Sequence, residues 1–494
     1  MLSRKIFLKL FAPHLSDNQA DTDRLLAALH TARGIVPEDI EVPLLVMRRL
    51  PESLRTADWR VTAAVGRAAG GWRLQDVEPG DKTKRHFGLA VDAGTTTIAA
   101  AVVNLISGNI VAVTSGENAQ AAVGKDILTR LQSAEEPGGL EKLRSLLVES
   151  VNRTAAKAAA EAGVNPVEIT AVAVGANTAM IHFLLGLDPR YLYREPYIPA
   201  VNAPGLFRAT DVGLDVHPEA AVYCMPGVGS YIGGDAVAGI LVSGMHRQNE
   251  VALFVDIGTN MEIVIGNAEW LVAAAGAAGP ALEGGIVKQG MRAVPGAVAR
   301  VRIDPLTHRV TYTVIGGEKA RGLCGSAVVD AMAGMLKAGI IDSAGTFRDG
   351  REAFVIVPAG EAAAGTDIAI TQQDIKNFLR SKGAVSAAVE TILASVGLLP
   401  HEIGWFYAAG AFGEHLDVKA AVATGLYPDL PRERIVVLGN SSLEGARRSL
   451  VSEEARRELG AICRRVTYCE LNVNAEFMPR FAGSQFFPIV DPRI

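Results

Sequence analysis

The chain has 494 residues, 49% of them hydrophobic and 20% charged, which exceeds what one ordinary core can hold and predicts two or three domains. A net charge of −5, without a basic tract interleaved with aromatic residues, excludes a nucleic-acid-binding surface. No apolar run is long enough to span a bilayer and the N-terminus lacks the apolar segment of a signal peptide, so we expect a cytoplasmic protein with no membrane partner.

Residues 1–85 have the pattern of a small α+β domain that ends in a polar connector, Glu78–Arg85. No motif in this domain carries recognisable chemistry, so we interpret it as a spacer or docking module. The predicted elements are strands at 4–10, 44–47, 59–64 and 71–77 and a helix at 22–31.

The next domain, predicted at 86–250, begins with the stretch around which the chain is organised. An apolar run, Leu89–Val91, is typical of a buried strand and ends at Asp92, and Gly94 and Thr95–Thr97 follow where the chain must turn. This pattern is typical of a phosphate hairpin. The glycine lets backbone N–H groups approach an anion, threonine hydroxyls donate to phosphate oxygens, and the aspartate holds Mg²⁺ through water. A single copy is weak evidence for a phosphate-binding hairpin, because many strands leave a sheet through a glycine turn.

The remainder of this lobe alternates helices and strands. A helix follows Asn177 and Thr178, and two interpretations stay open: these residues cap the helix, or its N-terminus faces the cleft and assists anion binding. His182 lies on the apolar face of that helix, where we expect a packed core residue. The predicted elements are strands at 98–104 and 169–174 and helices at 126–133, 140–162 and 236–243.

A glycine-rich loop, Pro226–Asp235, leads into the last of these helices. Its spacing, G-x-G-x-x-x-G, is one residue longer than the dinucleotide-binding fingerprint, so a nicotinamide enzyme is a weak alternative. Two interpretations of the glycines stay open: close helix packing and direct contact with a ligand.

A second hairpin repeats the first. The run 253–255 ends in Asp256, and the turn Gly258–Asn260 follows. Two copies predict two similar lobes, each offering one hairpin to a shared triphosphate. Glu262 is expected to face the same way as Asp256, where it orients a water or the metal if that face lines the cleft and is simply paired otherwise.

The second lobe, predicted at 251–494, holds further glycine-rich stretches at 276–285 and 322–326. The strand at 405–409 breaks at Gly410 and Gly413, and a flat base can lie against bare backbone there, so adenosine is expected at this point. The predicted elements are helices at 327–338, 372–379, 384–397 and from 443, and strands at 263–266, 405–409 and 435–439.

The four cysteines form neither a Cys-x-x-Cys nor a zinc-like pattern, so we expect buried thiols instead of a disulfide framework or a metal cage. Cys463 and Cys469 are close enough in sequence to leave a redox pair open as a minor alternative.

The order of these parts resembles the actin, sugar-kinase and Hsp70 ATPase superfamily. Within it, the stretches 255–262, 276–285, 322–326 and 408–413 are similar to the reductive activators of corrinoid proteins, and the likeness covers nearly the whole chain. The resemblance implies an α/β, two-lobed actin-like (ribonuclease H-like) ATPase fold preceded by a small α+β domain.

The resemblance also implies an activity: an ATPase coupled to electron transfer, which restores the cobalt of a corrinoid protein from Co(II) to Co(I) for methyl transfer. ATP, Mg²⁺, a corrinoid-protein partner and a homodimer follow from it. The expected catalytic residues are Asp92, Asp256 and Glu262, with the two aspartates also on Mg²⁺, and the expected ATP-binding residues are Gly94, Thr95, Thr96, Thr97, Gly258, Thr259, Asn260, Gly279, Gly325, Ser326, Gly410 and Gly413.

The sequence departs from the family in one respect. Members usually carry an N-terminal [2Fe-2S] domain with clustered cysteines, and no such cluster is present in these residues. Either the cluster belongs to a longer form of the protein, or the electron donor is a separate ferredoxin-like protein. Two other functions on the same fold stay open: a small-molecule kinase and a non-catalytic actin-like assembly protein.

Overall fold

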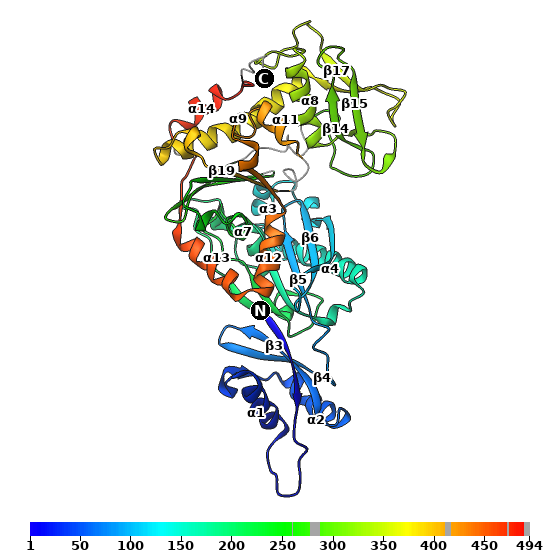
Figure 1. Cartoon of the computed structure of the whole chain (residues 1–494), viewed down its shortest axis with the longest axis vertical. Coiled ribbons are helices and arrows are strands. Elements are labelled where there is room, and N and C mark those ends of the chain that lie inside the picture. Colours follow the sequence, from blue (N-terminus) through cyan, green and yellow to red (C-terminus); the bar gives the residue numbers. More distant parts are fainter. Residues whose placement is uncertain (259, 277–286, 411–415, 472–473, 489–494) are drawn as a thin grey trace. The chain divides into compact units, whose positions relative to one another are not determined.

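The computed structural model describes residues 1–258, 260–276, 287–410, 416–471 and 474–488. The chain separates into two compact units (Figure 1). The first unit is Met1–Leu241 with Ser442–Arg464, and the second is Val242–Ser441 with Arg465–Ile494.

The first unit begins with a four-stranded sheet of order β1-β3-β4-β2. Helices α1 and α2 pack against this sheet and against each other, around a core that includes Leu25, Leu50 and Leu54. The bounds are β1 Ser3–Lys9, α1 Asp21–Arg33, β2 Ile40–Glu41, α2 Leu44–Thr56, β3 Arg60–Ala68 and β4 Gly71–Pro79.

The strand predicted at 44–47 is wrong, because these residues form the first turn of α2. The apolar residues that decide the structure are Val46, Leu50 and Leu54, which recur every four residues and are all buried. Their spacing is that of a helix face, and a window of four residues is too short to show it.

A six-stranded sheet of order β7-β6-β5-β8-β10-β9 forms the rest of the first unit. Strands β5, β8 and β10 run parallel, whereas β6, β7 and β9 are antiparallel to their neighbours. Helix α4 lies against β6 and β7 (Figure 1). The bounds are β5 Phe87–Ala93, β6 Thr97–Asn104, β7 Ile110–Glu117, α3 Ile127–Ser133, α4 Gly139–Ala162, β8 Ile169–Gly175, α5 Thr178–Leu185, β9 Gly205–Arg208, α6 Ala209–Val212, β10 Ala221–Cys224 and α7 Gly234–Ser243.

Two late helices, α12 (Ser441–Val451) and α13 (Glu453–Arg465), return to the first unit. A Cβ at Gly445 of α12 would lie 2.5 Å from the Cβ of Ala238, so α12 and α7 meet through small residues. The domain boundaries proposed at 85/86 and 250/251 stay predictions, and these two helices lie in the first unit although the sequence interpretation placed them in the second lobe.

The second unit holds a six-stranded sheet of order β20-β19-β11-β12-β13-β21, a three-stranded sheet and a two-stranded sheet. The bounds are β11 Ala252–Ile257, β12 Met261–Gly266, β13 Leu271–Gly276, β14 Ala297–Ile303, β15 Val310–Val314, β16 Gly322–Leu323, α8 Gly325–Lys337, β17 Ala353–Val357, β18 Ile368–Thr371, α9 Gln372–Ser395, β19 Trp405–Ala409, α11 Val418–Ala423, β20 Ile435–Gly439, β21 Val466–Tyr468 and α14 Phe477–Gly483.

The two helices predicted at 372–379 and 384–397 form a single helix, α9. Gly383, at the predicted break, lies inside it, where a Cβ would stand 3.0 Å from Gln485 Cγ. The glycine therefore allows a close approach of the C-terminal segment and does not end the helix. Within the described residues, no helix is long and apolar enough to cross a membrane.

Candidate functional site

The candidate site of the first unit lies at the carboxyl ends of its parallel strands. Asp92 is the second-to-last residue of β5, and Asn177 follows β8. The loop after β10 leads to Asp235 at the start of α7. Because parallel strands carry their carboxyl ends at one edge of a sheet, these side chains come from distant segments to one place.

A tight hairpin joins β5 to β6 at the place where the sequence predicts a phosphate-binding turn. The Gly94 amide donates to the Thr97 carbonyl over 3.1 Å, and a Cβ at Gly94 would lie 2.6 Å from that oxygen. A side chain at residue 94 would therefore break the turn. Asn177 Nδ2 donates to Thr95 Oγ1 over 3.0 Å, which ties the loop after β8 to the hairpin.

Asn177 is also the predicted helix cap, since its Oδ1 accepts from the Met180 amide at the start of α5. His182, farther along α5, is fully buried. Its Nδ1 lies 2.7 Å from the Thr178 carbonyl and its Nε2 accepts from the Ala200 amide. The interpretation of His182 as a core residue is confirmed.

The glycine-rich loop after β10 is shaped by packing. A Cβ at Gly233 would lie 2.4 Å from Asn177 Cα, and a Cβ at Gly234 would lie 2.8 Å from the Met225 carbonyl oxygen. Both contacts are with backbone atoms, which cannot rotate away. The packing interpretation of these glycines is therefore supported, and the close approach sets Asp235 at the start of α7 beside the end of the sheet.

Asp235 is a further candidate site residue, which the sequence interpretation did not single out. Burial raises its pKa to about 7, and the nearby negative charge of Asp92 raises it as well, although the carboxylate accepts a hydrogen bond from the Ala236 amide. Two neighbouring carboxylates at a strand edge suit a divalent cation, which would relieve their repulsion. The signal available in the sequence was an aspartate after two glycines at a helix start, and only the fold shows its proximity to Asp92.

In the second unit, Asp256 at the end of β11 stands opposite Glu262 of β12 in the antiparallel register. Directly opposed residues project to the same face of a sheet, so the predicted common orientation of Asp256 and Glu262 is confirmed. The hairpin between them is closed by the Gly258 amide, which donates to the Asn260 carbonyl over 2.9 Å.

Gly410 follows β19, the parallel neighbour of β11. Its φ of +92° is a conformation that side chains disfavour, and a Cβ there would lie 2.6 Å from Asp256 Oδ1. A side chain at residue 410 would therefore collide with the Asp256 carboxylate. This explains the glycine independently of the role toward adenosine that was predicted for Gly410.

The Gly325 and Ser326 pair begins α8, as predicted. The Ser326 side chain is buried, and its Oγ donates to the Ala299 carbonyl over 2.9 Å. Ser326 Oγ also lies 3.1 Å from Cys324 Sγ. The hydroxyl thus joins α8 to β14. Three predicted ATP-binding residues, Thr259, Gly279 and Gly413, lie outside the described residues.

All four cysteines belong to the described part of the chain and are free thiols. Among the described residues, no three histidine, cysteine or acidic side chains gather to hold a metal ion.

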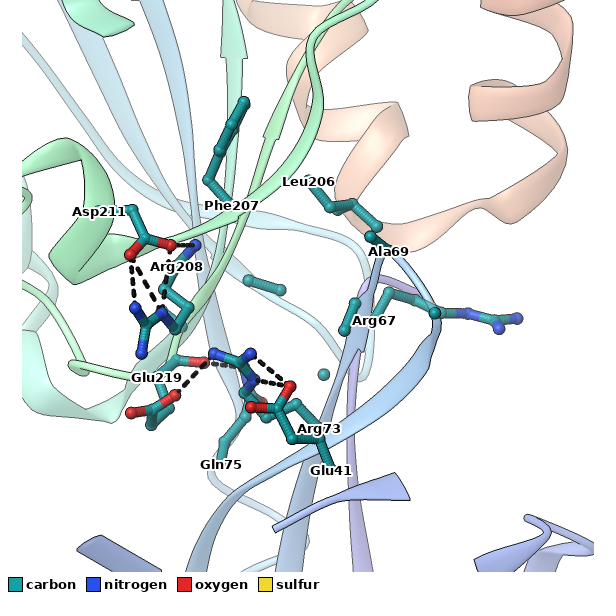
Figure 2. Close-up of a pocket in the computed structure, with 15 residues that line it drawn as sticks. Glu41, Arg67, Ala69, Arg73, Gln75, Leu206, Phe207, Arg208, Asp211 and Glu219 are labelled. Carbon is teal, nitrogen blue, oxygen red and sulfur yellow. Dashed lines mark hydrogen bonds and ion pairs between the residues drawn. The ribbon is translucent and has the colours of Figure 1, made fainter. Parts of the chain in front are cut away.

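A cavity of about 180 Å³ lies elsewhere in the first unit (Figure 2). Its lining includes Ala221 at the amino end of β10, the opposite end of the parallel strands from Asp92. Arg73 in this cavity bonds to Glu41 and Glu219, and Figure 2 shows a second pair between Arg208 and Asp211. The charged side chains of this cavity are thus paired within the chain. Because the cavity lies at the opposite end of the parallel strands, it is distinct from the candidate phosphate site.

Family models match the chain along its length. Residues 2–84 match the RACo linker region, residues 87–248 the RACo middle region, and residues 250–493 the C-terminal domain of RACo, an ASKHA domain. The predicted α/β actin-like ATPase fold is confirmed by this match.

Comparison with individual proteins gives relatives of the same kind. A solved structure titled reductive activator for corrinoid, iron-sulfur protein superposes with a TM-score of 0.91 at 38% identity, covering 99% of this chain and 79% of that one. The corrinoid activation enzyme RamQ of Eubacterium limosum is 29% identical over 93% of this chain and 80% of its own length. A [Co(II) methylated amine-specific corrinoid protein] reductase of Methanosarcina barkeri is 29% identical over 49% of this chain and 46% of its own length.

Proposed function

This chain belongs to the RACo family, and we propose that it uses ATP to drive reduction of a corrinoid protein from Co(II) to Co(I). The observation that carries the proposal is the 38% identity to a reductive activator, maintained over 99% of the chain with a TM-score of 0.91.

ATP has a clear physical task in such a reaction. For a one-electron step, about 60 mV is a tenfold change in the equilibrium constant, so a gap of a few hundred mV must be offset. Nucleotide binding can offset it only if the protein binds the corrinoid protein differently in its two nucleotide states. One route is a change in cobalt ligation within the complex.

Within the site, the hairpins starting at Gly94 and Gly258 bind the phosphates of ATP through backbone N–H groups and hydroxyls. Asp92, assisted by Asp235, and Asp256 would hold hydrated Mg²⁺, which would supply positive charge that neutralises the phosphates. Glu262 orients the attacking water. Burial and the charge of Asp92 raise the pKa of Asp235, and a bound cation would stabilise the charged form of that carboxyl.

The remaining predicted residues complete the ATP site. Gly410 and Gly413 would face the adenosine, while Thr95, Thr96, Thr259 and Asn260 would contact the phosphates. The other predicted ATP-binding residues are Thr97, Gly279, Gly325 and Ser326.

The partner is a corrinoid protein in the Co(II) state, and the electron comes from a [2Fe-2S] donor. The described residues include no cysteine cluster for such a centre, so this stretch of chain supplies ATP binding and partner docking. The active species is a homodimer.

The proposal is tested by measuring ATP hydrolysis with and without a corrinoid protein. We expect Co(II) corrinoid protein to stimulate hydrolysis, and the same protein in its methyl-Co(III) form to leave the rate at its basal level. Stimulation by a sugar or a carboxylic acid would instead indicate a small-molecule kinase, and light scattering that rises on nucleotide addition would indicate an assembly protein.

A further inference from the structure

Asn118, the residue after β7, makes three hydrogen bonds around the phosphate hairpin of the first unit. Its backbone amide donates to the Thr96 carbonyl over 3.0 Å, and its side-chain Nδ2 donates to the Gly94 carbonyl over 3.0 Å. Its Oδ1 accepts from the Gln120 amide over 3.0 Å. Asn118 is 0% exposed, so it bonds both hairpin carbonyls from inside the protein.

Two further buried side chains, Gln120 and Arg130, hold the side-chain amide of Asn118 in place. Its second Nδ2 hydrogen points to Gln120 Oε1 at 3.3 Å, and Arg130 Nη1 donates to the same oxygen over 3.0 Å. Gln120 Nε2 donates in turn to the Leu143 carbonyl of α4, and Arg130 Nε to the Gly124 carbonyl. Gln120 and Arg130 are both 0% exposed. Burial lowers the pKa of Arg130 to about 10, which leaves it a cation at neutral pH.

This network sets the direction of a hairpin donor. A peptide unit is planar, with its C=O and the following N–H on opposite sides. Because the Gly94 carbonyl points to Asn118, the Thr95 N–H points away from Asn118. The backbone donor of the hairpin is thus oriented before any anion arrives, and a preorganised donor binds an anion without the cost of reordering the loop.

We propose that Asn118 is a positioning residue for ATP binding, acting through the hairpin carbonyls and without contact to the nucleotide. The inference rests on the proposed function, because it takes the hairpin to be the phosphate-binding element. Asn118 contributes to affinity for the phosphates and nothing to affinity for the nucleoside.

The test compares Asn118→Ala with Asn104→Ala. Strand β6 begins at Thr97, next to the phosphate hairpin, and ends at Asn104. At ~3.3 Å per residue, Asn104 lies about 23 Å from Thr97. Its Oδ1 accepts from the Ile106 and Ser107 amides at the opposite turn. Both variants therefore remove an asparagine that holds a β6 turn, and only one turn is the phosphate hairpin.

Calorimetry gives the affinity of each protein for ATP and for adenosine. We expect Asn118→Ala to weaken ATP binding about tenfold, since the side-chain hydrogen bond to the Gly94 carbonyl is lost, while adenosine affinity changes less than about threefold. Asn104→Ala should keep both affinities. If Asn118→Ala does not fold, Asn118→Ser replaces it, because the serine hydroxyl can still accept from the Gln120 amide.

The outcomes separate the two ideas. Unchanged ATP affinity in the folded variant would overturn the inference, as would an equal loss of ATP and adenosine affinity, which would indicate a general role in stability. A wild-type protein that binds no ATP would overturn the proposed function itself. Selective loss of ATP affinity supports the inference.

Discussion

Replacing Gly410 with alanine tests whether backbone geometry holds the Asp256 carboxylate in place. The residue has φ +92°, and a Cβ would lie 2.6 Å from Asp256 Oδ1 and 2.8 Å from the Ile257 carbonyl oxygen. Positive φ costs an alanine about 1–2 kcal/mol. The contact adds a second effect, because the carboxylate must move by several tenths of an ångström, and a displacement of about 1 Å at a reacting group costs on the order of 10²-fold in rate.

Gly397 provides the matched control. It also has a positive φ, +71°, but a Cβ there has nothing within 4 Å. We expect Gly397→Ala to lose only the stability that its positive φ costs, and Gly410→Ala to lose more because its Cβ also meets the Ile257 carbonyl oxygen. Only Gly410→Ala should lose ATP hydrolysis, by about tenfold to a hundredfold. Equal ATP hydrolysis in the two variants would refute the reasoning that Gly410 sets the Asp256 position.

Three further predictions concern the first unit. Burial lowers the pKa of His86 from 6.5 to about 3, so the unfolded chain takes up the proton first and stability falls as pH drops from 6.5 toward 3. His86→Gln should remove up to about 1.4 kcal/mol per pH unit of that fall in urea unfolding, and a variant with the wild-type pH dependence would contradict this. Asp235→Asn should lower Mg²⁺-dependent ATP hydrolysis by roughly tenfold or more, because one carboxylate of the cation site becomes neutral, and an unchanged Mg²⁺ titration would contradict this. Gly233→Ala should destabilise the protein by about 1–3 kcal/mol in urea unfolding, since its Cβ would lie 2.4 Å from Asn177 Cα, whereas Gly70→Ala, with nothing within 4 Å, is the control that should behave as wild type.

The fold was predictable where the signal is local. The hairpins at Asp92 and Asp256 each combine a buried apolar strand with a glycine turn, and both form as predicted. The family resemblance is confirmed by the RACo models along the whole chain. Two local errors arose where tertiary packing decides the outcome: Leu44–Met47 became helical through the buried face that continues to Leu54, and Gly383 stays within α9 because a neighbouring segment packs on it.

The candidate site was less predictable, because its members are joined by topology. Nothing local connects Asp235 with Asp92, or Asn177 with Thr95. Their proximity follows from the parallel order of β5, β8 and β10, which brings three carboxyl ends together. Asn118 carries no motif of its own, and its role emerges only from the carbonyls that it bonds. The homodimer and the [2Fe-2S] donor stay predictions.

The most direct test of the proposed activity follows the corrinoid cobalt by its absorbance, with a low-potential chemical reductant standing in for the iron-sulfur donor. With the chain present, ATP should produce Co(I) from Co(II), and ADP or the omission of Mg²⁺ should not. ATP hydrolysis that proceeds in the same mixture while the amount of Co(I) stays at the level of the ATP-free control would contradict the account.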